Sequence, residues 1–105
     1  MIPTLDAHRA EIVALCRRFH VRRLEVFGSA ARGGDFDPAR SDADFLVTFA
    51  PDVRDDLALF EDFKAALEAM LGRPVDLVER PAIETSRNYI RRRRILAEAE
   101  AVYAG

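Results

Sequence analysis

The chain has 105 residues, of which 50% are hydrophobic and 32% are charged, and its formal net charge is −2. This length suits one small domain with a single two-layer core. No apolar run approaches the roughly 20 residues that span a bilayer. Pro3 and Asp6 stand where a signal peptide would be basic and then apolar. We therefore expect one domain over residues 1–105, in the cytoplasm and away from membranes.

The cysteine and histidine content limits the kinds of metal site that the chain can form. A single cysteine excludes an internal disulfide, and one Cys with two His cannot make a tetrahedral zinc site at the usual spacing. Cys16 lies on the apolar side of a helical pattern and is interpreted as a buried structural thiol. His8 and His20 are expected at the surface. Any metal site in this chain should therefore consist of carboxylates.

Patterns in the first part of the chain predict a helix, a strand and a turn. Apolar residues recur at helical spacing over 5–19. The β-branched and aromatic stretch 23–27 predicts a short strand that ends at Gly28. A brief helical turn is expected over 30–32, and a surface loop over 35–41.

The second part predicts two more strands, each followed by a helix. Residues 42–49 alternate as in a strand. Apolar residues over 51–72 have the helical period, and the glycine at the end predicts a helix terminus. Residues 74–79 predict a third strand, and 85–104 a final helix. One face of the second strand should carry Asp42, Asp44, Leu46 and Thr48, and the other Ala43, Phe45, Val47 and Phe49.

Three aspartates are the candidate metal ligands. Asp42 and Asp44 are two positions apart in a strand, so they should project from one face about 6 to 7 Å apart. On a buried face such like charges are costly, and a Mg²⁺ ion that also binds phosphate oxygens removes the cost. Asp76, within the apolar third strand, is the expected third ligand. Two Mg²⁺ ions would activate a hydroxyl and neutralise a leaving pyrophosphate, with Asp76 as a candidate general base.

A glycine-serine turn is the candidate phosphate site. Gly28 and Ser29 would open a helix, where backbone N–H groups and a hydroxyl can bind an anion. Arg32 is interpreted either as a phosphate contact or as a solvated loop cation. An isolated Asp-x-Asp is usually a strand end, and an isolated Gly-Ser is usually a turn. Occurring together with Asp76, they indicate a site for a metal-bound polyphosphate.

Two stretches resemble the signature of the minimal nucleotidyltransferases of the DNA polymerase β superfamily. They are GSAARG at 28–33 and SDADFLV at 41–47. The resemblance implies a small α/β (α+β) protein with a mixed sheet of three to four strands packed against helices. It implies transfer of a nucleoside monophosphate from an NTP. It also implies that Gly28 and Ser29 bind the triphosphate, that Asp42 and Asp44 hold both metals, and that Asp76 holds the catalytic metal.

Many members of this family are antitoxins of HEPN/MNT toxin–antitoxin pairs, which implies a function. The chain would transfer AMP from ATP, with two Mg²⁺ ions as cofactors, to a tyrosine of a HEPN ribonuclease toxin. Only 29 residues follow Asp76, too few for a domain that binds an acceptor, so a partner protein is expected to present it. The alternatives are a binding-only antitoxin that blocks the toxin sterically, and a stand-alone nucleotidyltransferase for a small molecule or RNA. Assembly with the toxin or with itself stays open.

The arginine run at 91–94 has several interpretations. Four successive helical residues encircle the axis, so they cannot share one face. They could form a solvated turn, contact a partner protein or the nucleotide, or bind nucleic acid. The net charge is too near zero to indicate general nucleic-acid binding. Because Tyr89, Ile90 and Tyr103 accompany the run, the terminal helix is the expected partner surface.

Overall fold

A mixed four-stranded sheet forms the centre of the structure, a computed structural model that describes residues 8–27, 43–53 and 55–105. The strand order is β3-β2-β1-β4. Strand β1 (Val21–Phe27) runs antiparallel to β2 (Ala43–Phe49) and to β4 (Glu100–Ala104), whereas β2 and β3 (Val75–Glu79) are parallel. The predicted fold class, a mixed sheet of three to four strands packed against helices, is confirmed.

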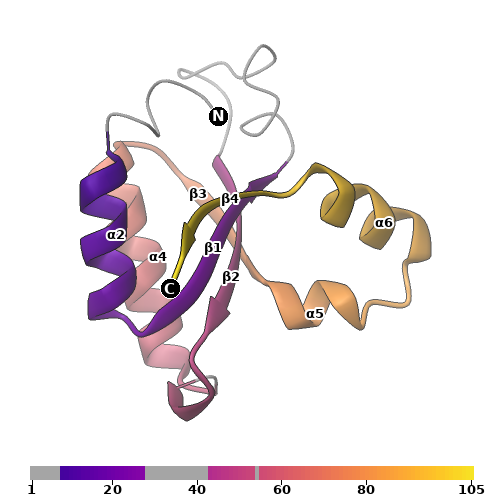
Figure 1. Cartoon of the computed structure of the whole chain (residues 1–105), viewed down its shortest axis with the longest axis horizontal. Helices are drawn as coiled ribbons and strands as arrows, with labels where there is room; N and C mark the ends of the chain where they lie inside the picture. The colour runs from indigo at the N-terminus through magenta and orange to yellow at the C-terminus, as the bar shows by residue number, and fades with distance from the viewer. Residues whose placement is uncertain (1–7, 28–42, 54) are drawn as a thin grey trace.

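Helices lie on both sides of this sheet (Figure 1). On one side are α2 (Arg9–Arg18) and α4 (Leu57–Leu71), and on the other are the short helices α5 (Arg80–Glu84) and α6 (Tyr89–Glu98). Helix α2 lies within the predicted helix 5–19, of which residues 5–7 are outside the described residues. None of the helices described is long and apolar enough to cross a membrane.

Two hydrophobic cores hold the layers together. The larger core packs α2 and α4 on the sheet, with Phe63 in tilted or edge contact with Phe19 and Phe49 at centroid distances of 5.6 and 5.9 Å. The smaller core joins Phe27, Leu46, Ile83 and Ile95 on the other face. Strand β2 divides its side chains between the cores as its alternation predicts. Phe45, Val47 and Phe49 enter the larger one and Leu46 the smaller.

Helix α4 begins later than predicted. A 3-10 turn occupies Pro51–Val53, and the helix starts only at Leu57. The reason is the cap at Asp56, whose side chain accepts a hydrogen bond from the Leu59 backbone N–H at 3.0 Å. The predicted end is confirmed, because Gly72 adopts φ 69°, in the left-handed region that favours glycine.

The prediction of one helix over 85–104 is wrong. The chain forms α5 and then α6, where Asn88 caps the Arg91 backbone N–H at 3.1 Å, and it then becomes extended at Ala99. Strand β4 pairs with β1, and Val102, only 4% exposed, enters the larger core. Alanine and glutamate favour helix locally, but pairing with the open edge of β1 satisfies backbone groups and buries Val102.

Candidate active site

Two of the three predicted aspartates lie side by side. Asp44 and Asp76 are register partners in the parallel pair β2–β3. Neighbouring strands are about 4.8 Å apart and register partners project from the same face, so the two carboxylates are adjacent. Each is the second residue of its strand, so both lie at the edge of the sheet where β2 and β3 begin.

The expectation that these acids lie on a buried face is wrong for Asp76. Asp76 is exposed and Asp44 is half-buried. On β2 and β3 the smaller core covers this face only from Leu46 and Val78 onward, two positions beyond the aspartates. The carboxylate pair is therefore at the rim of the sheet, where solvent and a substrate can reach it.

Both strands are anchored next to the aspartates. The Val75 backbone N–H donates to Glu68 Oε2 at 3.0 Å, so the side chain of an α4 residue fixes the start of β3. Strand β2 is anchored by its other neighbour, β1. There Phe27 lies opposite Asp44, is 7% exposed and packs in the smaller core. Because their strands are held this firmly, the aspartates are well suited to hold a ligand in a defined geometry.

The remaining predicted site residues cannot be placed. Gly28, Ser29, Arg32 and Asp42 lie outside the described residues, as do the predicted turn 30–32 and loop 35–41. Within residues 8–27, 43–53 and 55–105, no group of three or more metal-binding side chains occurs. The adjacent carboxylates of Asp44 and Asp76 nevertheless supply the oxygen ligands that Mg²⁺ prefers, so the donor set fits that ion.

An ion pair between a buried glutamate and a half-buried arginine lies near this edge, and it was not found from the sequence. Glu25 is 2% exposed, and it is the buried charged residue of the described chain. Arg80 Nη1 lies 2.6 Å from each of its carboxylate oxygens, and Arg23 Nε lies 3.3 Å from Oε1. The hydrogen bond to Glu25 is the largest effect that raises the pKa of Arg80. The available signal was an acid between Leu24 and Val26 in an apolar strand.

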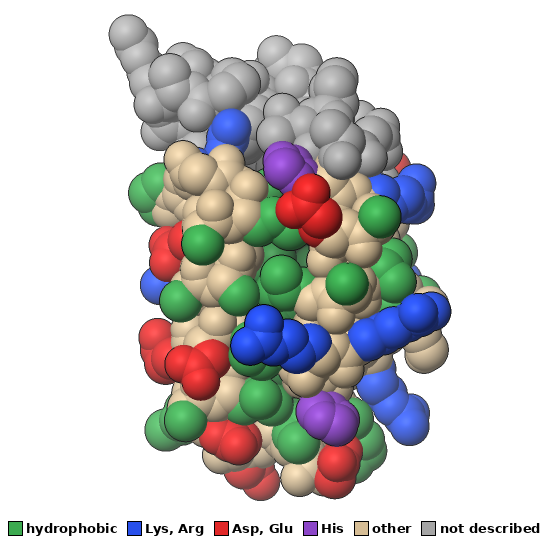
Figure 2. Space-filling model, turned by 90° about the vertical axis from the view of Figure 1, so that its left-hand side faces the viewer, with side chains coloured by type: hydrophobic (Ala, Val, Ile, Leu, Met, Phe, Trp, Pro, Cys, Tyr) green, Lys and Arg blue, Asp and Glu red, His purple; other side chains and the backbone are tan. Residues whose placement is uncertain are grey.

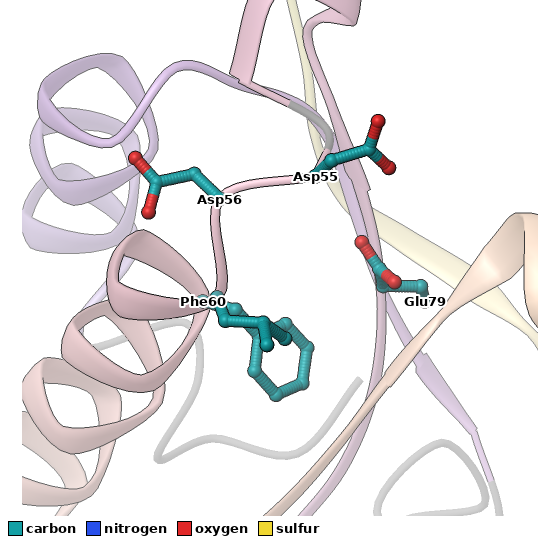
Figure 3. A pocket seen from close by; sticks show the side chains of 5 residues that line it. Asp55, Asp56, Phe60 and Glu79 are labelled. Carbon is teal, nitrogen blue, oxygen red and sulfur yellow. The ribbon is translucent and has the colours of Figure 1, made fainter.

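An acidic pocket lies at the opposite end of the sheet (Figure 3). Its volume is about 260 Å³, and it lies between the start of α4 and Glu79, the last residue of β3. The lining residues are Asp55, Asp56, Leu57, Phe60 and Glu79. The carboxylates of Asp55 and Asp56 point away from one another (Figure 3), and Asp56 is engaged as the cap of α4. This pocket is therefore separate from the sheet edge that carries Asp44 and Asp76.

Helix α6 carries an exposed surface of arginine and apolar side chains. Tyr89 and Ile90 are 54% and 78% exposed. Arg92 and Arg93 place their guanidinium groups 5.5 and 5.7 Å from the centre of the Tyr89 ring. Arg92 is half-buried and donates to the Ser86 carbonyl at 3.2 Å, while the other three arginines of 91–94 are exposed, so the run does encircle the helix. The α2–α4 side instead shows acidic, basic and apolar side chains intermixed (Figure 2).

Comparison with known proteins gives the class of this fold, that of the nucleotidyltransferases. Residues 12–100 match the nucleotidyltransferase domain family. The chain is 40% identical over 81 residues to protein adenylyltransferase MntA from Thermococcus cleftensis, covering 77% of this chain and 75% of that protein. The chain therefore belongs to the nucleotidyltransferase domain family, and the resemblance seen in its sequence is confirmed.

Solved structures share the fold. A minimal nucleotidyltransferase matches with a TM-score of 0.73 at 36% identity, covering 95% of each chain. A chain from a toxin–antitoxin complex with AMP-PNP matches with a TM-score of 0.64 at 20% identity, covering 92% of this chain and 73% of the other. A chain from an MntA–HepT toxin–antitoxin complex gives a TM-score of 0.60, also at 20% identity, covering 95% of this chain and 73% of the other.

Proposed function

We propose that this protein is an antitoxin that transfers AMP from ATP to a tyrosine of a HEPN ribonuclease toxin and thereby neutralises it. The observation that carries the proposal is the pairing of Asp44 with Asp76 at an accessible edge of the sheet. The 40% identity to a protein adenylyltransferase supports protein as the acceptor. The toxin–antitoxin complexes that share the fold support a toxin as that protein.

In this proposal each site residue has a chemical role. Asp42 and Asp44 would hold two Mg²⁺ ions, and Asp76 would hold one of them. When bound, these ions lower the pKa of the attacking hydroxyl and neutralise the leaving pyrophosphate. Gly28 and Ser29, with Arg32, bind and orient the triphosphate.

The transfer itself is a displacement at the α-phosphorus of ATP. The tyrosine oxygen forms a bond to the α-phosphorus. At the same time the bond between this phosphorus and the pyrophosphate oxygen breaks, and pyrophosphate leaves. Asp76 accepts the hydroxyl proton, because it is an exposed carboxylate at the edge where the acceptor must arrive. The role of the strand anchors at Glu68 and Phe27 is to keep the carboxylates aligned through this step.

Binding of the toxin is assigned to α6 in the same proposal. Its exposed Tyr89 and Ile90 and its exposed arginines have the composition of interface hot spots. The helix also lies apart from the α2–α4 layer, on the side of the sheet that bears Asp44 and Asp76 (Figure 1). A protein docked there could reach the aspartate edge.

Two other functions compete with this one. A binding-only antitoxin would block the toxin without chemistry, and a stand-alone nucleotidyltransferase would modify a small molecule or RNA. Adjacent carboxylates repel one another without a cation, so a steric blocker gains nothing from Asp44 and Asp76. That repulsion favours the catalytic interpretation.

The test is to incubate the purified protein with a HEPN ribonuclease toxin from the same organism, ATP and Mg²⁺, and to measure the intact mass of the toxin. We expect a gain of one or more AMP units and loss of ribonuclease activity, both absent with Asp76→Asn. Neutralisation without a mass gain would identify a steric blocker. Incorporation of labelled AMP into RNA or a small molecule, but not into the toxin, would identify a stand-alone enzyme.

A further inference from the structure

We infer that the Glu25–Arg80 ion pair positions Asp44 and Asp76 for nucleotide transfer by fixing α5 and the smaller core against the sheet. This inference rests on the proposed function. It assigns Arg80 and Glu25 as positioning residues, which act through the strands that carry the aspartates.

The pair joins two distant parts of the chain across the sheet. Glu25 lies in β1, and Arg80 directly follows β3 as the first residue of α5. Since β2 lies between β3 and β1, the arginine reaches over β2 to place Nη1 at 2.6 Å from both carboxylate oxygens. Its Nε also lies 3.3 Å from Glu84, which orients the guanidinium within α5.

The register places this pair one row behind the aspartates on the same face. Glu25 is opposite Leu46, and Leu46 is opposite Val78. The next row toward the edge is Phe27, Asp44 and Asp76. A displacement of α5 would therefore be transmitted to the aspartate row through the side chains that lie between.

The smaller core provides that connection. It packs Ile83 of α5 and Ile95 of α6 against Phe27 and Leu46. Phe27 of β1 is the register partner of Asp44. Leu46 lies on β2, two positions beyond Asp44. The ion pair therefore fixes the position of α5 against Phe27 and Leu46, the core side chains nearest to the aspartates.

Stability alone is a weak explanation for the pair. Apolar residues of similar volume at a buried ion pair often give a protein of equal or higher stability, because the charges no longer have to be desolvated. Unlike such apolar residues, a guanidinium holds its carboxylate partner at a fixed distance and in a fixed direction. A defined position of α5 is what the pair supplies and apolar contacts do not.

The test replaces both members together, as Glu25→Leu with Arg80→Met, so that no unpaired charge stays buried. We expect a melting temperature equal to or above that of the parent, a kcat for AMP transfer at least about tenfold lower, and a KM for ATP within about twofold. Amide hydrogen exchange should become faster at residues 25–27 and 43–46. Glu84→Gln is the matched control, because it removes an exposed contact of Arg80 and keeps Glu25 paired.

The outcomes separate this inference from the proposed function. If the parent transfers no AMP, the proposed function fails, and hydrogen exchange alone decides the inference. A double variant with the parent's kcat and exchange rates overturns it. If that variant does not fold, Arg80→Lys replaces it, since lysine keeps the charge but loses the planar fork. Parent kcat and exchange rates in Arg80→Lys would overturn the inference, and a lower kcat at an unchanged melting temperature would support it.

Discussion

Asp44 on β2 and Asp76 on β3 are register partners, and the connection between their parallel strands includes all of α4. Parallel strands need such a crossover, so this carboxylate pair exists only when α4 packs on the sheet. Glu68 of α4 reinforces the dependence by binding the backbone next to Asp76. The adjacency of the two aspartates therefore depends on the packing of α4 in the larger core.

Neutralising one aspartate should separate activity from stability. In Asp44→Asn or Asp76→Asn we expect transfer to fall by about 10² to 10³, or roughly 3 kcal/mol or more, because a proposed metal ligand loses its charge. The melting temperature should stay equal or rise, since like-charge repulsion is relieved. Asp55→Asn, in the pocket at the other end of the sheet, is the control of equal charge change. Parent rates in the two variants would rule out both residues as metal ligands.

ATP binding should require a divalent cation. The triphosphate would meet the carboxylates of Asp44 and Asp76 at one edge, and anions repel until a cation bridges them. Calorimetry with ATP should detect binding in Mg²⁺ or Mn²⁺ and lose it in EDTA. Equal affinity in both conditions would contradict the metal-bridged site.

Sequence patterns predict β1, β2 and β3 well, because the alternation of side chains along a strand is a local rule. The alternation over β2 correctly assigns Leu46 and Phe45 to opposite faces of the sheet. Asp76 is noticeable because it is an acid inside the apolar strand β3. Strand β4 is different, since its alanine and glutamate residues favour helix and only the distant edge of β1 makes it a strand. The Glu25–Arg80 pair spans 55 positions, and no local pattern can indicate such a partner.

Cys16 should make stability fall at high pH. Burial raises the pKa of its thiol from 9.0 to about 12, so the native state binds this proton more tightly than the unfolded state. The stabilisation is complete below pH 9 and is lost as pH rises from 9 to 12, by up to about 4 kcal/mol.

The measurement is urea unfolding of the parent and of Cys16→Ala at about pH 8 and pH 10.5. The parent should lose about 2 kcal/mol more than the variant over this range, because only the parent carries the thiol. Other titrating groups are common to both proteins and cancel in the difference. Equal losses would show that the thiol ionises as readily in the native state as in the unfolded chain.

Charge reversal on α6 should weaken toxin binding without affecting the nucleotide site. Arg91 and Arg94 are exposed on α6, and neither lies in the row of Phe27, Asp44 and Asp76. We expect Arg91→Glu with Arg94→Glu to lose co-purification with the toxin and to keep Mg²⁺-dependent ATP binding. Asp76→Asn should do the reverse, because the complex forms while no AMP is added.

The matched control for this surface is Arg17→Glu with Arg18→Glu, which reverses two exposed arginines on α2, across the sheet from α6 (Figure 1). An interface of this kind buries about 800 Å² on each partner, so it can cover one helical side and leave the other free. If the α2 reversal weakens the complex as much as the α6 reversal, binding depends on net charge rather than on α6. If Asp76→Asn also dissociates the complex, the aspartate edge is itself part of the interface, and recognition and chemistry share one surface.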